Sequence, residues 1–134
     1  MEKKQIAVLA FIAVALIGFR AMTGGTIDTT TNTGDELNMA LRSGRPVLVD
    51  FGSNSCTPCR QLRPILQEIK KEQEGKLEVL VIDVNKHQAL SGEYRIRVIP
   101  TLVFFDSRGK EMFRQQGFIS KAPLMGHLKK IGVS

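Results

Sequence analysis

Two cysteines are the residues of this chain whose type and spacing most directly indicate chemistry. Cys56 and Cys59 are the only cysteines in the sequence, and they stand three positions apart. A disulfide between them closes almost no loop, so it would provide little of the chain-entropy stabilisation of a structural disulfide. The pair therefore indicates thiol chemistry or metal binding rather than a structural crosslink.

The segments around the cysteines predict a strand that leads through a loop into a helix. Residues 47–51 (VLVDF) are typical of a strand buried on both faces, and 52–57 follow as a loop. From Pro58 or Cys59 onward, apolar residues recur at helical period. Residues three apart share a face in the first turn, where exposed N–H groups stabilise a thiolate. We therefore expect a lowered pKa for Cys56, the nucleophile, with Cys59 as the resolving thiol.

Asp50 is the second residue of chemical interest, because it is the charged residue within this apolar strand. A carboxyl group in such surroundings should have a raised pKa, which would let it relay a proton to or from Cys59. A structural aspartate that caps the following loop is the alternative interpretation. Both interpretations remain open from the sequence.

Together these segments resemble the thioredoxin family, over about residues 35–131. The resemblance implies the thioredoxin fold, an α/β domain with a mixed central sheet and helices on both faces, and it implies the same proton-relay role for Asp50. Val79 stands where the family commonly has a lysine near this acid. The matching stretches are 47–51, the Cys56-x-Pro58-Cys59 motif, Pro64 five residues past the second cysteine, 94–101 (YRIRVIPT), and Gly117 followed by Ser120 and Lys121.

The resemblance also implies a substrate-binding surface around the cysteines. It implies a cis peptide bond before Pro100 that faces the pair and leaves the Ile99 backbone free to pair with an extended substrate strand. Ser55, Thr57 and Pro58 would complete this surface. Ser55 and Thr57 stand where the family usually has tryptophan and glycine. We therefore expect the redox poise and the substrate surface, but not the fold, to differ from those of other members.

The remaining elements predict one α/β domain over residues 35–134. Strands alternate with helices first and a hairpin comes last, which gives a mixed sheet covered on both faces. The expected helices are 35–44, 58–74 with a kink at Pro64, 86–94 and 120–131, and the expected strands are 47–51, 78–84, 101–106 and 110–117, with a hairpin turn at 107–109.

The start of the chain differs in composition and predicts a membrane anchor and a tether. Residues 6–19 (IAVLAFIAVALIGF) are uncharged and, with their flanks, nearly long enough to span a bilayer, so 1–22 are assigned to one transmembrane helix or uncleaved signal. A cleaved signal peptide is the alternative, although Arg20 stands where a peptidase prefers small residues. Residues 23–34 are a Thr- and Gly-rich linker. Two lysines before the apolar run favour an extracytoplasmic domain, on the periplasmic or cell-surface side.

Charge and histidine content argue against other classes of protein. The chain has 19 Lys and Arg against 13 Asp and Glu, a net charge of +6 without a block of like sign, so no nucleic-acid partner is expected. His87 and His127 lie far from the cysteines without metal-ligand spacing, so we interpret both as solvated surface side chains and expect no metal site. Dithiol chemistry needs no other cofactor.

The leading hypothesis is a membrane-tethered thiol–disulfide oxidoreductase that reduces protein disulfides. Its partners would be disulfide-containing proteins and an upstream thiol reductant. Ile99 before Pro100 resembles the reducing branch of the family. The same site can run in reverse as a thiol oxidase or disulfide isomerase, because the direction depends on the reduction potential. A non-catalytic module that binds a metal or a partner through the cysteine loop is an alternative of a different class.

Overall fold

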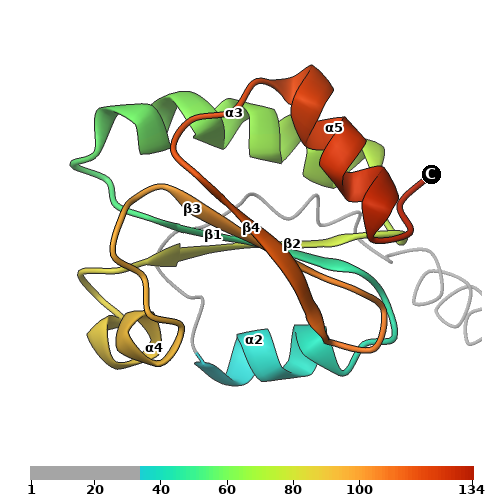
Figure 1. The fold of residues 1–134 in the computed structure, drawn as a ribbon, viewed down its shortest axis with the longest axis horizontal. Coiled ribbons are helices and arrows are strands. Elements are labelled where there is room, and N and C mark those ends of the chain that lie inside the picture. The colour runs from blue at the N-terminus through green and yellow to red at the C-terminus, as the bar shows by residue number, and fades with distance from the viewer. Residues whose placement is uncertain (1–33) are drawn as a thin grey trace, which may run out of the picture.

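The computed structural model describes residues 34–134, which form a four-stranded mixed sheet between two layers of helices (Figure 1). The strand order is β2-β1-β3-β4. The two central strands pair antiparallel, whereas β1 and β2 are parallel and β3 and β4 form an antiparallel hairpin. The mixed sheet is as predicted. The strands are β1 (Val47–Gly52), β2 (Glu78–Asp83), β3 (Thr101–Phe105) and β4 (Glu111–Gln116).

Each face of the sheet is covered by two helices, as Figure 1 shows. Helices α2 (Gly34–Leu41) and α4 (Gln88–Glu93) lie on one side, and α3 (Thr57–Glu72) and α5 (Lys121–Lys130) lie on the other. The α3 and α5 side holds the larger hydrophobic core, whereas the α2 and α4 side holds a second cluster. Burial of both sheet faces requires apolar side chains on both sides of the central strands, which explains why all six residues of β1 are buried.

The bounds of most elements agree with the predicted ranges to within two or three residues. The clearest difference is α4, which spans only Gln88–Glu93 instead of 86–94. Helix α2 begins at Gly34, which the sequence assigned to the linker. Pro64 lies inside α3, and the helix continues past it to Glu72. The predicted anchor over 1–22 lies outside the described residues, and so does the linker up to residue 33.

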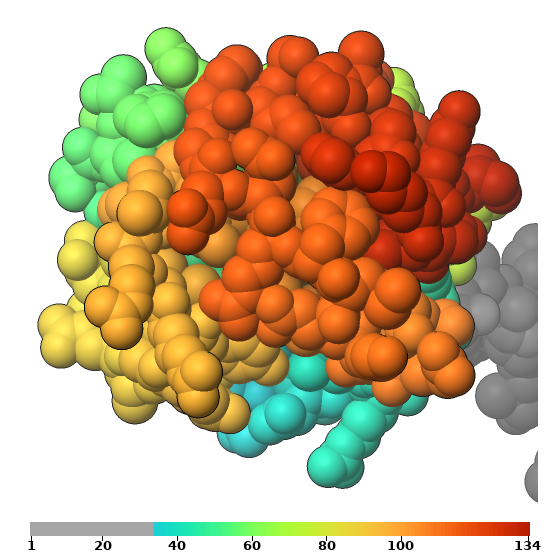
Figure 2. All heavy atoms as spheres, in the orientation of Figure 1, coloured from blue at the N-terminus to red at the C-terminus, as the bar shows by residue number. Residues whose placement is uncertain are grey.

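The interpretation of the two histidines as solvated was wrong. The His127 ring lies 5.7 Å from the Phe104 ring and 5.1 Å from the Phe113 ring, measured between centroids. It is half-buried because it follows Leu124 by three positions on the packed side of α5. His87 at the start of α4 is half-buried as well, and its Nε2 atom is buried. The contact between His127 and Phe113 joins α5 to β4, which adjoin on the face seen in Figure 2.

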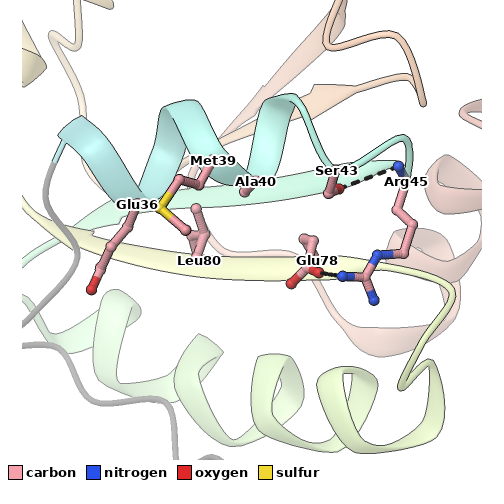
Figure 3. Close-up of a pocket in the computed structure, with 7 residues that line it drawn as sticks. All are labelled: Glu36, Met39, Ala40, Ser43, Arg45, Glu78 and Leu80. Atoms are coloured by element: carbon pink, nitrogen blue, oxygen red, sulfur yellow. Dashed lines mark hydrogen bonds and ion pairs between the residues drawn. The ribbon is translucent and has the colours of Figure 1, made fainter.

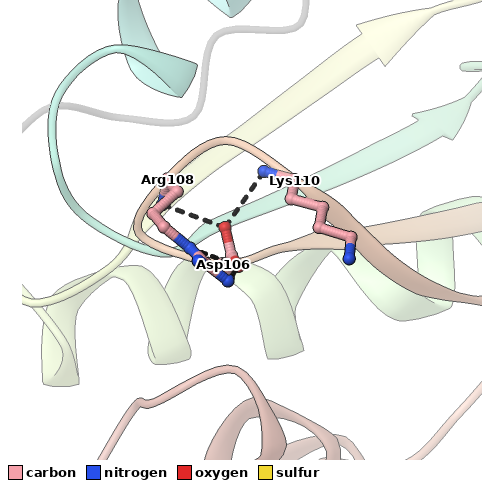
Figure 4. A network of polar contacts seen from close by, with 3 residues as sticks. All are labelled: Asp106, Arg108 and Lys110. Atoms are coloured by element: carbon pink, nitrogen blue, oxygen red, sulfur yellow. Dashed lines mark hydrogen bonds and ion pairs between the residues drawn. The ribbon is translucent and has the colours of Figure 1, made fainter.

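The predicted hairpin turn joins β3 to β4, and one carboxylate organises it (Figure 4). The Asp106 Oδ1 atom accepts hydrogen bonds from the backbone N–H groups of Lys110 at 3.0 Å and Arg108 at 2.9 Å. The Lys110 bond is the main cause of a lowered pKa for Asp106. Gly109 has a φ of 76°, and a Cβ there would lie 2.7 Å from the Leu41 carbonyl oxygen. The turn therefore requires glycine for both conformation and space.

No helix within residues 34–134 is long and apolar enough to span a membrane.

Candidate functional site

The cysteine pair lies where β1 passes through a loop into α3. Cys56 is the N-cap of the helix and lies in the predicted loop 52–57, and the helix begins at Thr57, one residue before the earliest predicted start at Pro58. The Cys56 Sγ atom accepts a hydrogen bond of 3.3 Å from the Cys59 backbone N–H. The two cysteines form a disulfide with their Cα atoms 5.2 Å apart. Because the Cys56 sulfur already accepts from a helix N-terminus, this geometry favours negative charge on Cys56.

The two sulfurs differ in their access to solvent. Cys59 is 1% exposed, whereas Cys56 is half-buried. Ser55 and Thr57 on either side of Cys56 are exposed, and Pro58 is half-buried. Cys56 can therefore be approached from solvent, whereas Cys59 is shielded from solvent.

A second loop faces the cysteines from the start of β3. The Ile99–Pro100 peptide bond is cis, as the resemblance implied. The Ile99 carbonyl oxygen lies 4.0 Å from the Cys56 Sγ atom, although the two residues are 43 positions apart. The Pro100 carbonyl accepts a hydrogen bond of 2.8 Å from the Gly117 N–H, which joins this loop to the end of β4. The structure thus places Ile99 and Pro100 beside Cys56.

The Asp50 carboxyl group is buried directly behind the pair. Its residue is 2% exposed, and burial raises its pKa to about 7 from an ordinary value of 3.8, while the positive charge of Arg63 lowers it. The direction of this shift agrees with the prediction from the sequence. A Cβ atom at Gly52 would lie 3.3 Å from the Cys59 Sγ and 3.5 Å from the Asp50 Oδ2. The sulfur and the carboxylate therefore face the same small space, which glycine leaves open.

Two residues that the sequence analysis missed hold the cysteine loop in place. The Ser53 hydroxyl accepts a hydrogen bond of 3.2 Å from the Ser55 N–H and lies 2.9 Å from the Ser55 hydroxyl. Asn85, which follows β2, donates from its amide to the same Ser53 hydroxyl at 2.9 Å. No local pattern could have revealed the Ser53–Asn85 contact, because it joins segments 32 residues apart.

Arg63 is a third missed residue, and a sequence signal for it exists. It follows Cys59 by four positions, so a helical pattern places both on one face of α3. The Arg63 side chain is half-buried, and its Nε atom has no hydrogen-bond partner within residues 34–134. Arg63 could therefore have been identified as a candidate site residue from its spacing to Cys59 alone.

A separate shallow pocket of about 470 Å³ lies between α2 and β2, away from the cysteines (Figure 3). Its rim carries an ion pair between Arg45 and Glu78. Its lining contains neither cysteine nor any other predicted site residue. Among residues 34–134 there is also no group of three or more His, Cys, Asp or Glu side chains placed to hold a metal ion.

Comparisons with known proteins agree with this geometry. The thioredoxin family model matches residues 28–130. Thioredoxin from Rickettsia felis is 39% identical over 90 residues, which cover 67% of this chain and 85% of that protein. Thioredoxin from Mycoplasmoides gallisepticum is 40% identical over 94 residues, which cover 70% of this chain and 92% of that protein.

Solved structures show the same likeness. A mutant thioredoxin from Halobacterium salinarum superposes with a TM-score of 0.68 at 28% identity, over 75% of this chain and 87% of that one. By sequence, part of a bifunctional thioredoxin reductase/thioredoxin from Mycobacterium leprae is also similar to this chain, with 36% identity over 68% of this chain and 20% of that protein. With its C-x-x-C disulfide at the start of a helix and a cis-proline loop beside it, this chain belongs to the thioredoxin family.

Proposed function

We propose that this thiol–disulfide oxidoreductase reduces disulfides in protein substrates, with Cys56 as nucleophile and Cys59 as resolving thiol. The observation that carries the proposal is the hydrogen bond from the Cys59 N–H to the Cys56 Sγ at the start of α3. The dipole of helix α3 acts on Cys56 more than on Cys59, because Cys56 caps the N-terminus of the helix. In the reduced protein this lowers the pKa of the Cys56 thiol.

The reaction proceeds through two disulfide exchanges. The Cys56 thiolate attacks one sulfur of the substrate disulfide, which breaks that bond, forms a mixed disulfide and releases the other substrate sulfur as a thiolate. Cys59 then loses its proton and attacks Cys56, so the Cys56–Cys59 bond forms and the second substrate thiolate leaves. Two electrons pass from the dithiol to the substrate. An upstream thiol reductant restores the dithiol, and no other cofactor takes part.

Asp50 accepts the proton that Cys59 loses in the second exchange. The Asp50 Oδ2 and the Cys59 Sγ border the same space at Gly52. A carboxyl group with a pKa of about 7 is half ionised at neutral pH, so it can take up and release a proton under working conditions. The raised pKa comes from burial, which disfavours the charged carboxylate.

The substrate chain would bind along the Ile99 backbone, with Ser55, Thr57 and Pro58 on the other side of Cys56. The position of the Ile99 carbonyl beside the sulfur supports this arrangement. An extended peptide there would pair with the backbone and bring its own sulfur to Cys56.

Reduction of insulin by the full chain in the presence of dithiothreitol tests the function. Cys56→Ser should abolish turnover, whereas Cys59→Ser should accumulate a mixed disulfide that mass spectrometry can detect. Turnover by Cys56→Ser at the wild-type rate would contradict the assignment. Titration against glutathione buffers tests the direction, because a potential well above about −200 mV would indicate an oxidase or isomerase instead.

The sequence of residues 1–22 supports the further proposal that the domain is tethered to a membrane and lies outside the cytoplasm. Alkaline phosphatase fused after Ser134 should then be active in intact bacterial cells. An inactive fusion, with a fluorescent protein at the same position emitting normally, would place the domain on the cytoplasmic side.

A further inference from the structure

The sheet supplies apolar neighbours, not charges, to the buried Asp50 carboxylate. Side chains alternate along β1, so Asp50 shares the face of Leu48, which packs in the core under α3. The residues opposite Asp50 are Val81 on β2 and Leu102 on β3. Val79 lies two residues before Val81 on β2, on the same face of the sheet, and is buried in the same core. A positive charge for Asp50 must therefore come from another element.

Helix α3 brings such a charge to this face. Arg63 lies one turn after Cys59, the sulfur that shares the space beside Asp50. The Arg63 Nε and the Asp50 Oδ1 are both buried and have no hydrogen-bond partner within residues 34–134. The charge of Arg63 also acts on Asp50, because it lowers the pKa that burial raises. Within residues 34–134, one buried atom of each of these two oppositely charged side chains thus lacks a hydrogen-bond partner.

Two other charged residues near this face, Asp83 and Arg60, make hydrogen bonds elsewhere. Asp83 at the end of β2 accepts a hydrogen bond of 2.9 Å from the Asn85 N–H. Arg60, on the first turn of α3, donates from its guanidinium to the Asn54 carbonyl and to the Thr57 hydroxyl, each at 3.3 Å. Arg60 is therefore directed toward the cysteine loop, and Arg63 is the cation of α3 that acts on Asp50.

We propose that Arg63 is the positioning residue for proton transfer between Cys59 and Asp50, as the countercharge that keeps part of the buried Asp50 carboxylate ionised at neutral pH. The inference rests on the proposed function. An ionised Asp50 can accept the Cys59 proton when Cys59 attacks the mixed disulfide, whereas a protonated Asp50 cannot. Without the guanidinium, desolvation acts alone, and Asp50 stays protonated to higher pH.

Titration of the Asp50 carboxyl by carbon NMR in the oxidised full chain tests the charge directly, because the disulfide does not titrate. Arg63→Gln should move the Asp50 midpoint to higher pH by roughly 0.5 to 1 unit. Arg63→Met removes the same charge and should give the same shift, whereas Arg63→Lys should restore the wild-type midpoint. Lys71→Gln, which removes one positive charge from the exposed end of α3, should leave the Asp50 midpoint unchanged.

The pH profile of insulin reduction tests the link to catalysis. Arg63→Gln should be roughly two- to fivefold slower than wild type at pH 7, because a smaller fraction of Asp50 is ionised. The rate should recover toward the wild-type value at alkaline pH. In an Asp50→Asn background, Arg63→Gln should cause no further change, since the two residues act on the same step.

The two proposals fail in different ways. An unchanged Asp50 midpoint in both Arg63→Gln and Arg63→Met, in a wild-type protein that reduces insulin, would overturn the role of Arg63 and leave the reductase intact. The same holds if Arg63→Lys behaves like Arg63→Gln, because shape rather than charge would then matter. A chain that shows the expected midpoint shift but cannot reduce insulin would support the electrostatic pair and contradict the proposed function.

Discussion

At the scale of single residues, the site separates one accessible sulfur from a buried sulfur and a buried acid. Cys56 is half-buried at the surface, while Cys59 and Asp50 are 1% and 2% exposed. Both buried groups border the small space left by Gly52. A carboxylate kept in such surroundings lowers the stability of the fold at neutral pH.

We therefore expect Asp50→Asn to stabilise the oxidised protein at pH 8 by about 2–4 kcal/mol. Between its ordinary pKa of 3.8 and its folded value of about 7, Asp50 ionises in the unfolded chain but stays protonated in the folded one. The wild-type free energy of unfolding should therefore fall as pH rises through this window and stay level above it. Below it, the carboxyl is protonated in both states, so the variant should differ little near pH 3.

Urea denaturation across this pH range measures how the free energy of unfolding changes with pH. Asp106→Asn is a matched control of opposite sign, because hydrogen bonds lower the pKa of Asp106. Its removal should weaken the fold at neutral pH rather than strengthen it. The interpretation of Asp50 would be wrong if wild type and Asp50→Asn showed parallel pH dependence.

At the scale of elements, the site depends on a loop that is held from the side. Helix α3 provides Cys56 at its cap, Cys59 in its first turn and Arg63 one turn later. The loop before it is connected to the end of β2 through Ser53 and Asn85. We expect this contact to help hold Cys56 in position relative to Ile99, because the loop itself has no regular helix or strand hydrogen bonding to fix it.

We expect Asn85→Ala to reduce stability by about 0.5–1.5 kcal/mol and to slow insulin reduction several-fold. The hydrogen bond to Ser53 is lost, and the loop then samples orientations in which Cys56 is misplaced. Asn54→Ala, at an exposed asparagine of the same loop, is the control and should change neither quantity. Equal activity of both variants, measured under identical conditions, would show that the Ser53–Asn85 contact does not position the loop.

At the scale of the whole molecule, the described residues form one sheet with an apolar core on each side. The core under α3 contains Leu66, and the core under α2 contains Leu37, and both side chains are almost completely buried. The cysteines and Asp50 lie at the edge of the first core, so their geometry depends on the packing of α3 against the sheet.

Leu66→Ala should therefore lower the free energy of unfolding by about 2–5 kcal/mol, and Leu37→Ala should do so by a similar amount. Both variants should unfold in a single urea transition, because the two cores share the same strands. Met39→Ala, at a side chain that is 72% exposed, should change the free energy of unfolding by less than about 0.5 kcal/mol. Separate transitions for the two layers would contradict this view of the domain.

The sequence by itself determined the features that depend on neighbours along the chain. Helical period and a βα turn place Cys56 and Cys59 on one face at the start of α3, and a carboxyl in an apolar strand predicts the raised pKa of Asp50. These features need only local spacing, so they could be predicted without a structure. The cis bond before Pro100 was predicted as well, but only through the resemblance to a family.

Only the tertiary structure decided which distant segments meet. The approach of Ile99 to Cys56, the bond between Asn85 and Ser53, and the packing of His127 against aromatic rings each join elements far apart in the sequence. Such contacts depend on the order of strands and on how helices pack over the sheet, and these follow from burial of the whole core rather than from any local pattern. The four-residue spacing from Cys59 already places Arg63 on the same face of α3, whereas only the structure shows that its Nε atom is buried without a hydrogen-bond partner within residues 34–134.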